Sequence, residues 1–358
     1  MKIPITPVMV TGSTGYVGGV LVKQLLKAGL TVHCPVRDPA KESKLQHLKD
    51  LDGSEKLKFF KADLLTKGSY LEPMKGCSVV FHLAAPFITV VPKDKVQEVL
   101  LDPSIKGALN VLESANAESS IKRVVMTSSI AAIVTDGTDC EEALKRTGKM
   151  CNEETWNESA TETFSPYALS KTMAEKAAWA FMKENDCSYE LAVCNPSFVL
   201  GPGVKVFEGS ESYAFMKKMG DGTYKKTPDI SMAVVDVRDV ARGHMAAGFL
   251  PSVTGERYIL NGANTNILDM GKVIFEAYPD YPLPSSRIPK WLIYCIAPLL
   301  GQTRQYVSRS VGTNKDLDNA KSLRKLELGE YTPLAKTLND MFKQCVDNGF
   351  IPFVESKH

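Results

Sequence analysis

The 358-residue sequence is poor in the residues that build metal centres, and it has no large excess of either charge. Its five histidines do not cluster with carboxylates at a metal-ligand spacing, so we expect no metal site. Its eight cysteines form neither a CxxC pair nor a zinc spacing, which predicts free thiols in a reducing compartment. A net charge of +2, without basic stretches interleaved with aromatics, argues against nucleic acid as a partner.

Long hydrophobic runs are also missing. Residues 288–300 are the most apolar stretch, but they contain Lys290 and two prolines and are shorter than the about 20 residues of a membrane span. We therefore expect a cytoplasmic protein without a membrane span, acting as a monomer or a homodimer. Whether Cys140 and Cys151, which flank a polar segment, have a redox role stays open. The stripe that we expect to pack in the core, or to form a lid, comprises Trp291, Leu292, Cys295 and Ile296.

With 44% hydrophobic residues the chain can bury a large core, and its first half alternates short β-branched runs with helical patterns. This alternation predicts an α/β fold, a Rossmann-type doubly wound parallel sheet. We assign residues 1–195 to this dinucleotide-binding domain, to which the chain returns at about 231–262. Residues 196–230 and 263–358 are assigned to a smaller C-terminal substrate-binding lobe. The predicted strands are residues 5–10, 31–36, 57–61, 79–83, 123–127 and 191–195.

A glycine turn follows the first predicted strand, in the strand–turn–helix context of a dinucleotide-binding fingerprint. Gly12 allows a positive φ, Gly15 allows backbone N–H groups to approach phosphate oxygens, and Gly18 allows close helix–strand packing. The helix that follows would direct its positive N-terminus at a pyrophosphate. The alternative interpretation, an ordinary strand-to-helix turn, is weakened by the position of this motif on the first strand.

The end of the second predicted strand indicates which nicotinamide cofactor is bound. Arg37 stands where an acid would hold a ribose 2′-hydroxyl, and an arginine there can bind a 2′-phosphate. Lys41 and Lys44 add positive charge nearby. Asp38 is interpreted as a turn residue because it precedes a proline. These residues favour NADP (NADPH) over NAD.

Three residues downstream can carry carbonyl chemistry. Ser129 ends a predicted strand, and Tyr167 and Lys171 lie one turn apart on a helix that begins at Pro166. An ammonium beside a phenol stabilises the phenolate, so the tyrosine can donate a proton to a carbonyl oxygen that the serine holds. A tyrosine and a lysine four residues apart also occur by accident, but the glycine turn upstream favours catalysis.

The chain resembles the extended short-chain dehydrogenases/reductases, in the branch of dihydroflavonol 4-reductase, cinnamoyl-CoA reductase and related aldehyde and ketone reductases. The similarity covers nearly the whole length. It is carried by the glycine turn, by the Tyr167–Lys171 pair and by residues 36–39, 61–64, 80–84, 125–129, 195–197, 235–240 and 318–321.

This resemblance implies Ser129, Tyr167 and Lys171 as catalytic residues. It implies that Arg37 and Lys44 contact the 2′-phosphate, that Asp63 and Leu64 form the adenine pocket, and that Pro196 to Val199 form the nicotinamide wall. The full set of expected cofactor contacts is Gly12, Thr14, Gly15, Tyr16, Val17, Gly18, Arg37, Lys44, Asp63, Leu64, Ala84, Ala85, Thr127, Tyr167, Lys171, Pro196, Ser197 and Val199.

The substrate is less well defined. Residues 165–170 depart from the Asn-Trp-Tyr-Cys-Tyr segment of cinnamoyl-CoA reductases, and Val134 replaces the polar specificity residue of dihydroflavonol reductases. We therefore expect an NADPH-dependent reductase of a small, neutral, apolar aldehyde or ketone. A hydroxysteroid or sterol-type dehydrogenase, a nucleotide-sugar epimerase or dehydratase, and a non-catalytic NADP sensor remain alternatives. The residues expected to contact substrate are Phe87, Ile130, Val134, Phe207 and Tyr213.

Overall fold

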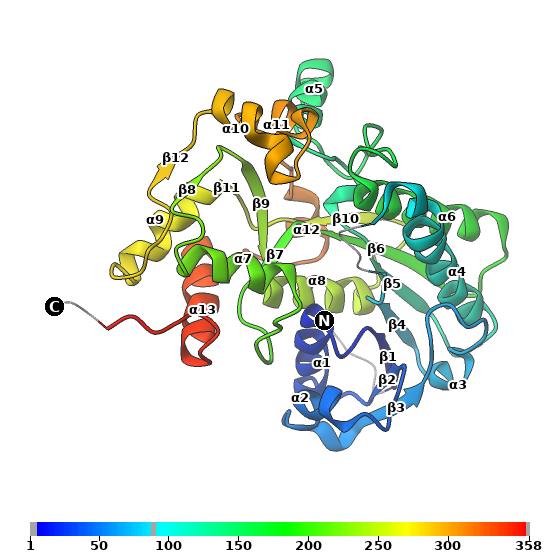
Figure 1. Ribbon diagram of the computed structural model, residues 1–358. Helices are drawn as coiled ribbons and strands as arrows, with labels where there is room; N and C mark the ends of the chain where they lie inside the picture. Colours follow the sequence, from blue (N-terminus) through cyan, green and yellow to red (C-terminus); the bar gives the residue numbers. More distant parts are fainter. Residues whose placement is uncertain (1–5, 87–90, 356–358) are drawn as a thin grey trace.

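The computed structural model describes residues 6–86 and 91–355 and confirms the expected α/β fold (Figure 1). Its main sheet has the strand order β10-β6-β5-β4-β1-β2-β3, and each neighbouring pair is parallel. This order reverses direction beside β1, which is where doubly wound sheets bind their ligands. The strands are β1 (Val8–Thr11), β2 (Val32–Val36), β3 (Leu57–Lys61), β4 (Val79–His82), β5 (Arg123–Thr127), β6 (Glu190–Pro196) and β10 (Arg257–Leu260).

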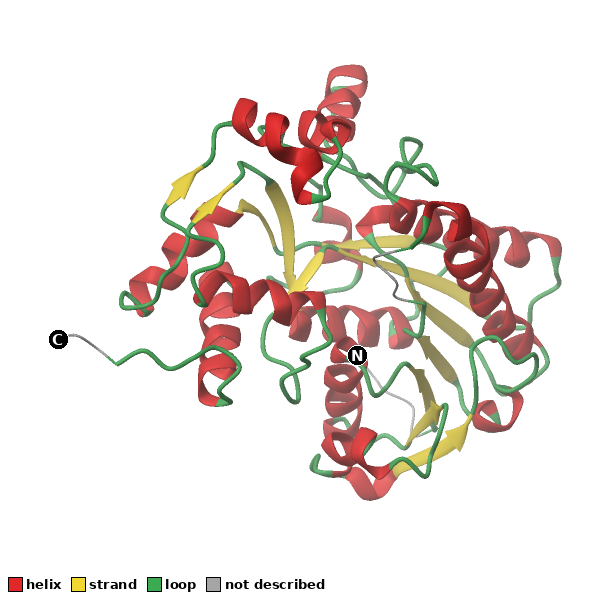
Figure 2. Cartoon of the chain, in the orientation of Figure 1, coloured by secondary structure: helices red, strands yellow, loops and turns green. Residues whose placement is uncertain are grey.

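The alternation of side chains along each strand creates two apolar layers. Val8 and Val10 pack on the face that is covered by α1 (Tyr16–Lys27) and α8 (Val237–Phe249). Met9 points to the opposite face, under α3 (Leu71–Met74), α4 (Asp102–Asn116) and α6 (Pro166–Glu184). Figure 2 shows the sheet as the layer between these helices. The connecting elements are η1 (Glu42–Lys44), α2 (Gln46–Lys49), η2 (Ser54–Lys56), η3 (Lys93–Lys95), η4 (Gln97–Leu101) and η5 (Ile130–Ala132).

A second group of elements follows β6. Its three-stranded sheet has the order β11-β9-β7, formed by β7 (Phe198–Leu200), β9 (Ser231–Asp236) and β11 (Ala263–Asn266). Residues 231–236 therefore do not return to the main sheet as we had expected; within 231–262 only β10 does. The other elements are α7 (Glu211–Gly220), β8 (Lys226–Thr227), α9 (Ile267–Ala277), β12 (Ser286–Arg287), α10 (Lys290–Ile296), η6 (Ala297–Leu300), α11 (Arg304–Ser310), α12 (Ala320–Lys325) and α13 (Leu334–Asp347).

The two groups of elements share one hydrophobic core. The Tyr16 hydroxyl on α1 donates to the Gly201 carbonyl at 2.5 Å, and Gln24 Nε2 donates to the Arg238 carbonyl at 3.0 Å. Asp236 links them again, because it ends β9 and caps α8 by accepting the Arg238 N–H at 2.7 Å. The smaller sheet is therefore fixed beside the carboxyl edge of the main sheet.

Residues 136–163 form a polar, charged segment that contains the helix α5 (Gly137–Thr147). Asp136 caps its start by accepting the Asp139 N–H at 3.2 Å, and Gly148 ends it with φ +70°. Only a narrow apolar face, formed by Cys140 and Ala143, is buried. The many charges of the segment concealed this helix, because its stability depends on its caps and on tertiary contacts.

Candidate active site

The glycine turn forms a cradle for an anion at the start of α1. Gly12 has φ +68°, and a Cβ on Gly18 would lie 2.1 Å from the Gly12 carbonyl oxygen, so a side chain cannot fit there. The first N–H groups of α1, from Tyr16 onward, have no acceptor within the helix. The buried Ser13 hydroxyl has no hydrogen-bond partner among the described residues. These features fit the pyrophosphate of a dinucleotide, with Thr14 and Gly15 at the tip of the turn.

Thr11 joins this cradle to the end of β4. Its hydroxyl oxygen accepts the N–H groups of Leu83 and Ala84, each at 3.0 Å, and lies 2.9 Å from His82 Nδ1. Burial and the nearby Lys171 ammonium lower the pKa of His82 to about 3, so its ring is neutral and Nδ1 accepts from Thr11. His82 is thus a core residue, and Ala84 lies against the glycine turn, since a Cβ on Gly12 would be 3.0 Å from its backbone nitrogen.

The residues expected around the adenosine lie at the ends of β2 and β3. Arg37 and Lys44 are exposed, and neither is ion-paired with an acid in the part of the chain that the structure describes. Asp38 accepts the Ala40 N–H at 3.0 Å, in agreement with its interpretation as a turn residue. Asp63 accepts the Leu65 N–H at 2.9 Å. Leu64, next to it, packs against Gly107 of α4.

Ser129 follows β5 with an extended backbone and caps η5, where its hydroxyl oxygen accepts the Ala131 N–H at 3.1 Å. The helix α6 packs directly on η5 and so brings Tyr167 to the same edge of the sheet. On α6, Lys171 Nζ lies 5.8 Å from the centre of the Tyr167 ring. The structure therefore gathers the three predicted catalytic residues beside the glycine turn.

The backbone is strained just before Tyr167. Ser165 has φ +59°, a left-handed conformation that few non-glycine residues adopt, and Pro166 follows as the first residue of α6. Such strain persists only where the surrounding structure holds it, and it is often found at functional sites. This conformation could not be predicted from the sequence, because serine does not favour it.

The residues expected around the nicotinamide have different environments. Pro196 and Ser197 are buried at the end of β6, and the Ser197 hydroxyl has no hydrogen-bond partner among the described residues. Val199 lies half-buried on β7. The Thr127 hydroxyl is instead bound to His244 Nε2 at 2.7 Å. Any contact of Thr127 with a cofactor would therefore come through its backbone.

A buried ion pair supports Ser129 from below, and our sequence analysis did not identify it. Glu175, whose side chain is fully buried, contacts Arg257 Nε at 2.5 Å and accepts from Asn195 Nδ2 at 2.8 Å. The same Asn195 nitrogen lies 3.1 Å from the Ser129 carbonyl oxygen. Arg257 also stacks on Trp156, with 3.8 Å between the guanidinium carbon and the ring centre. The only sign of this ion pair in the sequence was an acidic residue, Glu175, four residues after Lys171.

An apolar cavity of about 530 Å³ lies next to Ser129, between the smaller sheet and the α10–α11 segment. Ile130, the residue after Ser129, lines the cavity, and Phe198 and Phe215 contribute aromatic side chains to its wall. Lys315 is the one cation among its lining residues, and Nζ donates to the Thr135 carbonyl at 2.9 Å. Burial lowers the pKa of Lys315, so its charge is poorly solvated there.

Several residues that we expected to contact substrate lie outside the apolar cavity. Tyr213 is fully buried and donates to Gln344 Oε1 at 2.6 Å, and Phe207 packs against Tyr16. Both side chains pack against Tyr16 of α1, outside the cavity. Val134 is buried and borders a different cavity, under α5. The prediction for Phe87 falls outside the described residues. Of the four that the structure describes, only Ile130 lines the apolar cavity.

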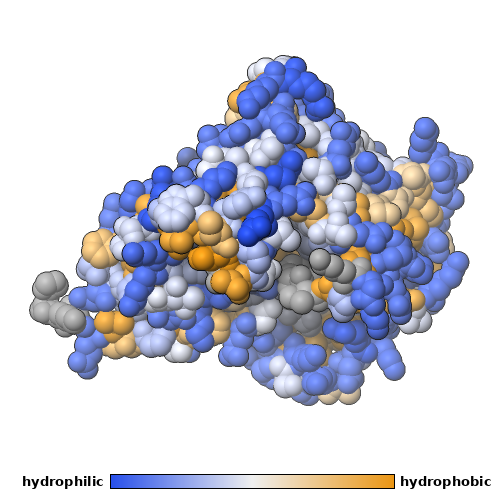
Figure 3. Space-filling model, turned by 45° about the horizontal axis from the view of Figure 1, so that its top comes forward, coloured by the Kyte–Doolittle hydropathy of each residue, from blue (hydrophilic) through white to orange (hydrophobic). Residues whose placement is uncertain are grey.

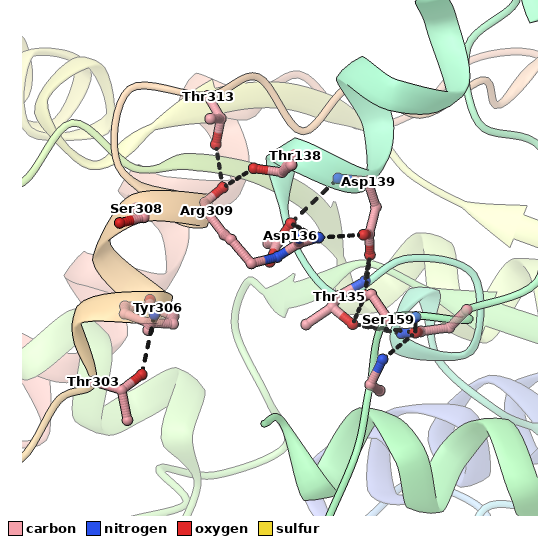
Figure 4. A network of polar contacts seen from close by, with 12 residues as sticks. Thr135, Asp136, Thr138, Asp139, Ser159, Thr303, Tyr306, Ser308, Arg309 and Thr313 are labelled. Carbon is pink, nitrogen blue, oxygen red and sulfur yellow. Dashed lines mark hydrogen bonds and ion pairs between the residues drawn. The ribbon is translucent and has the colours of Figure 1, made fainter. Parts of the chain in front are cut away.

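The outer wall of the cavity is fixed to α5 by a polar network (Figure 4). Arg309 on α11 contacts Asp136 at 2.8 Å and Asp139 at 2.5 Å. The Thr138 and Thr313 hydroxyls both donate to the Arg309 carbonyl at 2.8 Å. These contacts hold the apolar face of α11, including Val307 and Val311, against the cavity.

Comparisons with known proteins agree with this geometry. Residues 8–258 match the model of the NAD dependent epimerase/dehydratase family. A cinnamoyl-CoA reductase of Medicago truncatula is 39% identical over 282 residues, which cover 77% of this chain and 82% of that protein. The crystal structure of Gre2 from Candida albicans in complex with NADPH has a TM-score of 0.76 and 29% identity, covering 96% and 99% of the two chains.

A third comparison is with yeast methylglyoxal/isovaleraldehyde reductase Gre2, also solved with NADPH. It has a TM-score of 0.76 and 25% identity, and the match covers 96% of this chain and 99% of that one. The glycine cradle, the Ser129, Tyr167 and Lys171 cluster and these similarities lead to one assignment. The chain belongs to the NAD dependent epimerase/dehydratase family, the extended short-chain dehydrogenases/reductases, in the branch of the cinnamoyl-CoA and anthocyanidin reductases.

Proposed function

We propose that this chain is a cytoplasmic, NADPH-dependent reductase that converts a neutral, apolar aldehyde or ketone to the alcohol. The observation that carries the proposal is that Ser129, Tyr167 and Lys171 lie at the carboxyl edge of the main sheet, where the glycine turn also lies, and that Ile130, next to Ser129, lines the apolar cavity. The two yeast relatives solved with NADPH, one of them an aldehyde reductase by name, support the cofactor and the reaction class.

The residues present fit the proposed cofactor. The N–H groups at the start of α1 would receive the pyrophosphate, and Arg37 with Lys44 would hold the 2′-phosphate. Pro196, Ser197 and Val199 would border the nicotinamide. When bound, NADPH would supply the hydride to the carbonyl carbon. The rest of the chemistry is assigned to side chains of this chain.

Tyr167 donates its hydroxyl proton to the carbonyl oxygen, while Ser129 holds that oxygen by a hydrogen bond. The Lys171 ammonium lies 5.8 Å from the Tyr167 ring centre and stabilises the phenolate that remains. Asn195 and the Glu175–Arg257 pair fix the backbone of Ser129 from the buried side. The catalytic groups are therefore held in position before substrate arrives.

The cavity favours an apolar substrate. Its wall is formed mainly by aliphatic and aromatic side chains, and its single cation, Lys315, is already bound to a carbonyl oxygen. A sugar nucleotide would leave its phosphates and hydroxyls without enough partners there. A group that accepts one hydrogen bond from Lys315 is compatible with this wall.

Turnover with NADPH and a panel of aldehydes, ketones, steroids and UDP-sugars tests the proposal. The value of kcat/KM should rise along a homologous aldehyde series by about fourfold for each buried methylene until the cavity is full. Tyr167→Phe should remove most turnover and leave NADPH binding nearly unchanged, because only the proton donor is lost. A Tyr167→Phe variant that kept a large share of kcat, or a preference for a UDP-sugar, would refute it.

A further inference from the structure

The helix α10 and the segment after it carry a group of exposed apolar side chains. Trp291, which we had expected to pack in the core or to form a lid, is 68% exposed, and Leu299 is 87% exposed. The opposite side of the same segment, with Ile293 and Ile296, lines the apolar cavity. We call the exposed group the α10–α11 surface; it comprises Trp291, Leu292, Tyr294 and Leu299.

The charges around this surface have one sign. Residues 281–315 contain five basic residues and no aspartate or glutamate. Lys290 and Arg304 are exposed and form no ion pair with an acid in the described part of the chain. Asp136 and Asp139, which contact α11, are already bound to Arg309, and Arg287 is paired with Asp229 at 3.3 Å. The uncompensated charge at this surface is therefore positive.

We propose that the α10–α11 surface docks on an anionic lipid membrane. Tryptophan, tyrosine and leucine beside lysine and arginine are typical of elements that lie in the membrane interface. The segment is too short to span a bilayer, and no described helix is long and apolar enough to do so. Figure 3, which turns the α10–α11 end toward the reader, shows hydrophobic residues gathered left of centre and bordered by hydrophilic ones.

Charge complementarity favours a lipid surface over a second copy of this chain. Cytoplasmic leaflets carry anionic headgroups, which attract lysine and arginine, whereas two copies facing each other would bring their positive charges together. Because the other side of α10 lines the apolar cavity, docking also places that cavity next to the hydrocarbon phase. An apolar ligand dissolved in the membrane would then have a short path into the protein.

The full-length protein is tested by sedimentation with vesicles of phosphatidylcholine, with and without phosphatidylserine. We expect binding to the anionic vesicles that weakens with salt, together with a blue shift of tryptophan fluorescence. The double variant Trp291→Ser, Leu299→Ser should lower the partition coefficient by about tenfold or more, since two apolar side chains no longer enter the interface. Its matched control, Phe275→Ser with Phe353→Ser, removes exposed aromatic surface elsewhere and should change it less than about twofold.

Two double charge-reversal variants separate the electrostatic contribution to binding from an effect on folding. Lys290→Glu with Arg304→Glu should abolish the preference for anionic vesicles, whereas Lys27→Glu with Lys183→Glu makes the same change in net charge and should keep it. Thermal unfolding identifies any variant that fails to fold. The proposal is wrong if the wild type does not sediment with anionic vesicles, or if both variants of a pair lose binding equally. It is also wrong if Trp291→Ser with Leu299→Ser converts a dimer to a monomer, because a second copy then covers this surface.

Discussion

The buried pair of Glu175 and Arg257 should contribute to stability only as a pair. The Glu175 side chain is fully buried and that of Arg257 is 7% exposed. Removal of one partner leaves the other charge in the core without compensation, which costs about 3–5 kcal/mol of the free energy of unfolding. Replacement of both by apolar residues of similar size leaves no orphaned charge and costs much less than the two single changes together.

The experiment is a double-mutant cycle of Glu175→Met, Arg257→Met and the double variant, followed by urea unfolding. We expect each single variant to be destabilised by about 3–5 kcal/mol and the double variant to recover at least about 2 kcal/mol of the sum. When Glu175 is replaced, Arg257 still donates to the Glu153 and Thr155 carbonyls, at 3.0 Å and 2.8 Å. When Arg257 is replaced, Glu175 loses its cation, so the cost of Arg257→Met should lie at the upper end of the range. Additive costs in the cycle would refute the reasoning.

The same pair should act on catalysis through Asn195. Glu175→Gln can place an amide group where Glu175 Oε2 accepts from Asn195, and the Asn195 bond to the Ser129 carbonyl is then weakened. We expect a fall in kcat of roughly tenfold with little change in the KM for NADPH, since only the serine is displaced. An unchanged kcat would show that Ser129 keeps its position without this support.

Three further predictions concern the cofactor, the glycine turn and pH. Arg37→Ala should raise the KM for NADPH about ten- to a hundredfold and leave that for NADH nearly unchanged, because a charge-assisted phosphate contact of roughly 1.5–3 kcal/mol is lost; equal effects on both would exclude this role. Gly18→Ala should abolish NADPH binding, because its Cβ would lie 2.1 Å from the Gly12 carbonyl oxygen. The control Gly209→Ala, which meets no atom within 4 Å, should bind normally. Burial lowers the pKa of His244 to about 4, so the unfolded chain binds more protons below pH 6.5 and stability falls with acid. His244 should account for about 2 kcal/mol of the loss between pH 7 and 5, so His244→Gln should lose about that much less stability than the wild type, as measured by urea unfolding at both values.

The main sheet was predictable because its information is local. The six apolar runs that we predicted overlap β1 to β6. Parallel strands are buried on both faces, so their apolar runs are continuous and easy to recognise. The predictions failed where tertiary contacts decide: β9 joins a second sheet, and α5 forms in a charged segment.

The same division applies to the site. Sequence alone identified the glycine turn and the positions of Ser129, Tyr167 and Lys171, because fixed spacings and backbone sterics define these motifs. It could not place most of the cavity wall, since Tyr224, Ile293 and Lys315 come from segments far apart in the chain.

Only the tertiary structure showed which side of each late helix faces the cavity and which faces solvent. Tyr213 and Phe215 are both aromatic residues of α7, yet Tyr213 is buried against Tyr16 of α1, whereas Phe215 lines the cavity. The sequence of α10 is apolar on two sides, and the fold covers only the side of Ile293. Sequence therefore determined the chemistry, which depends on residue type and local spacing. The packing of distant elements determined the shape of the cavity and the exposed surface beside it.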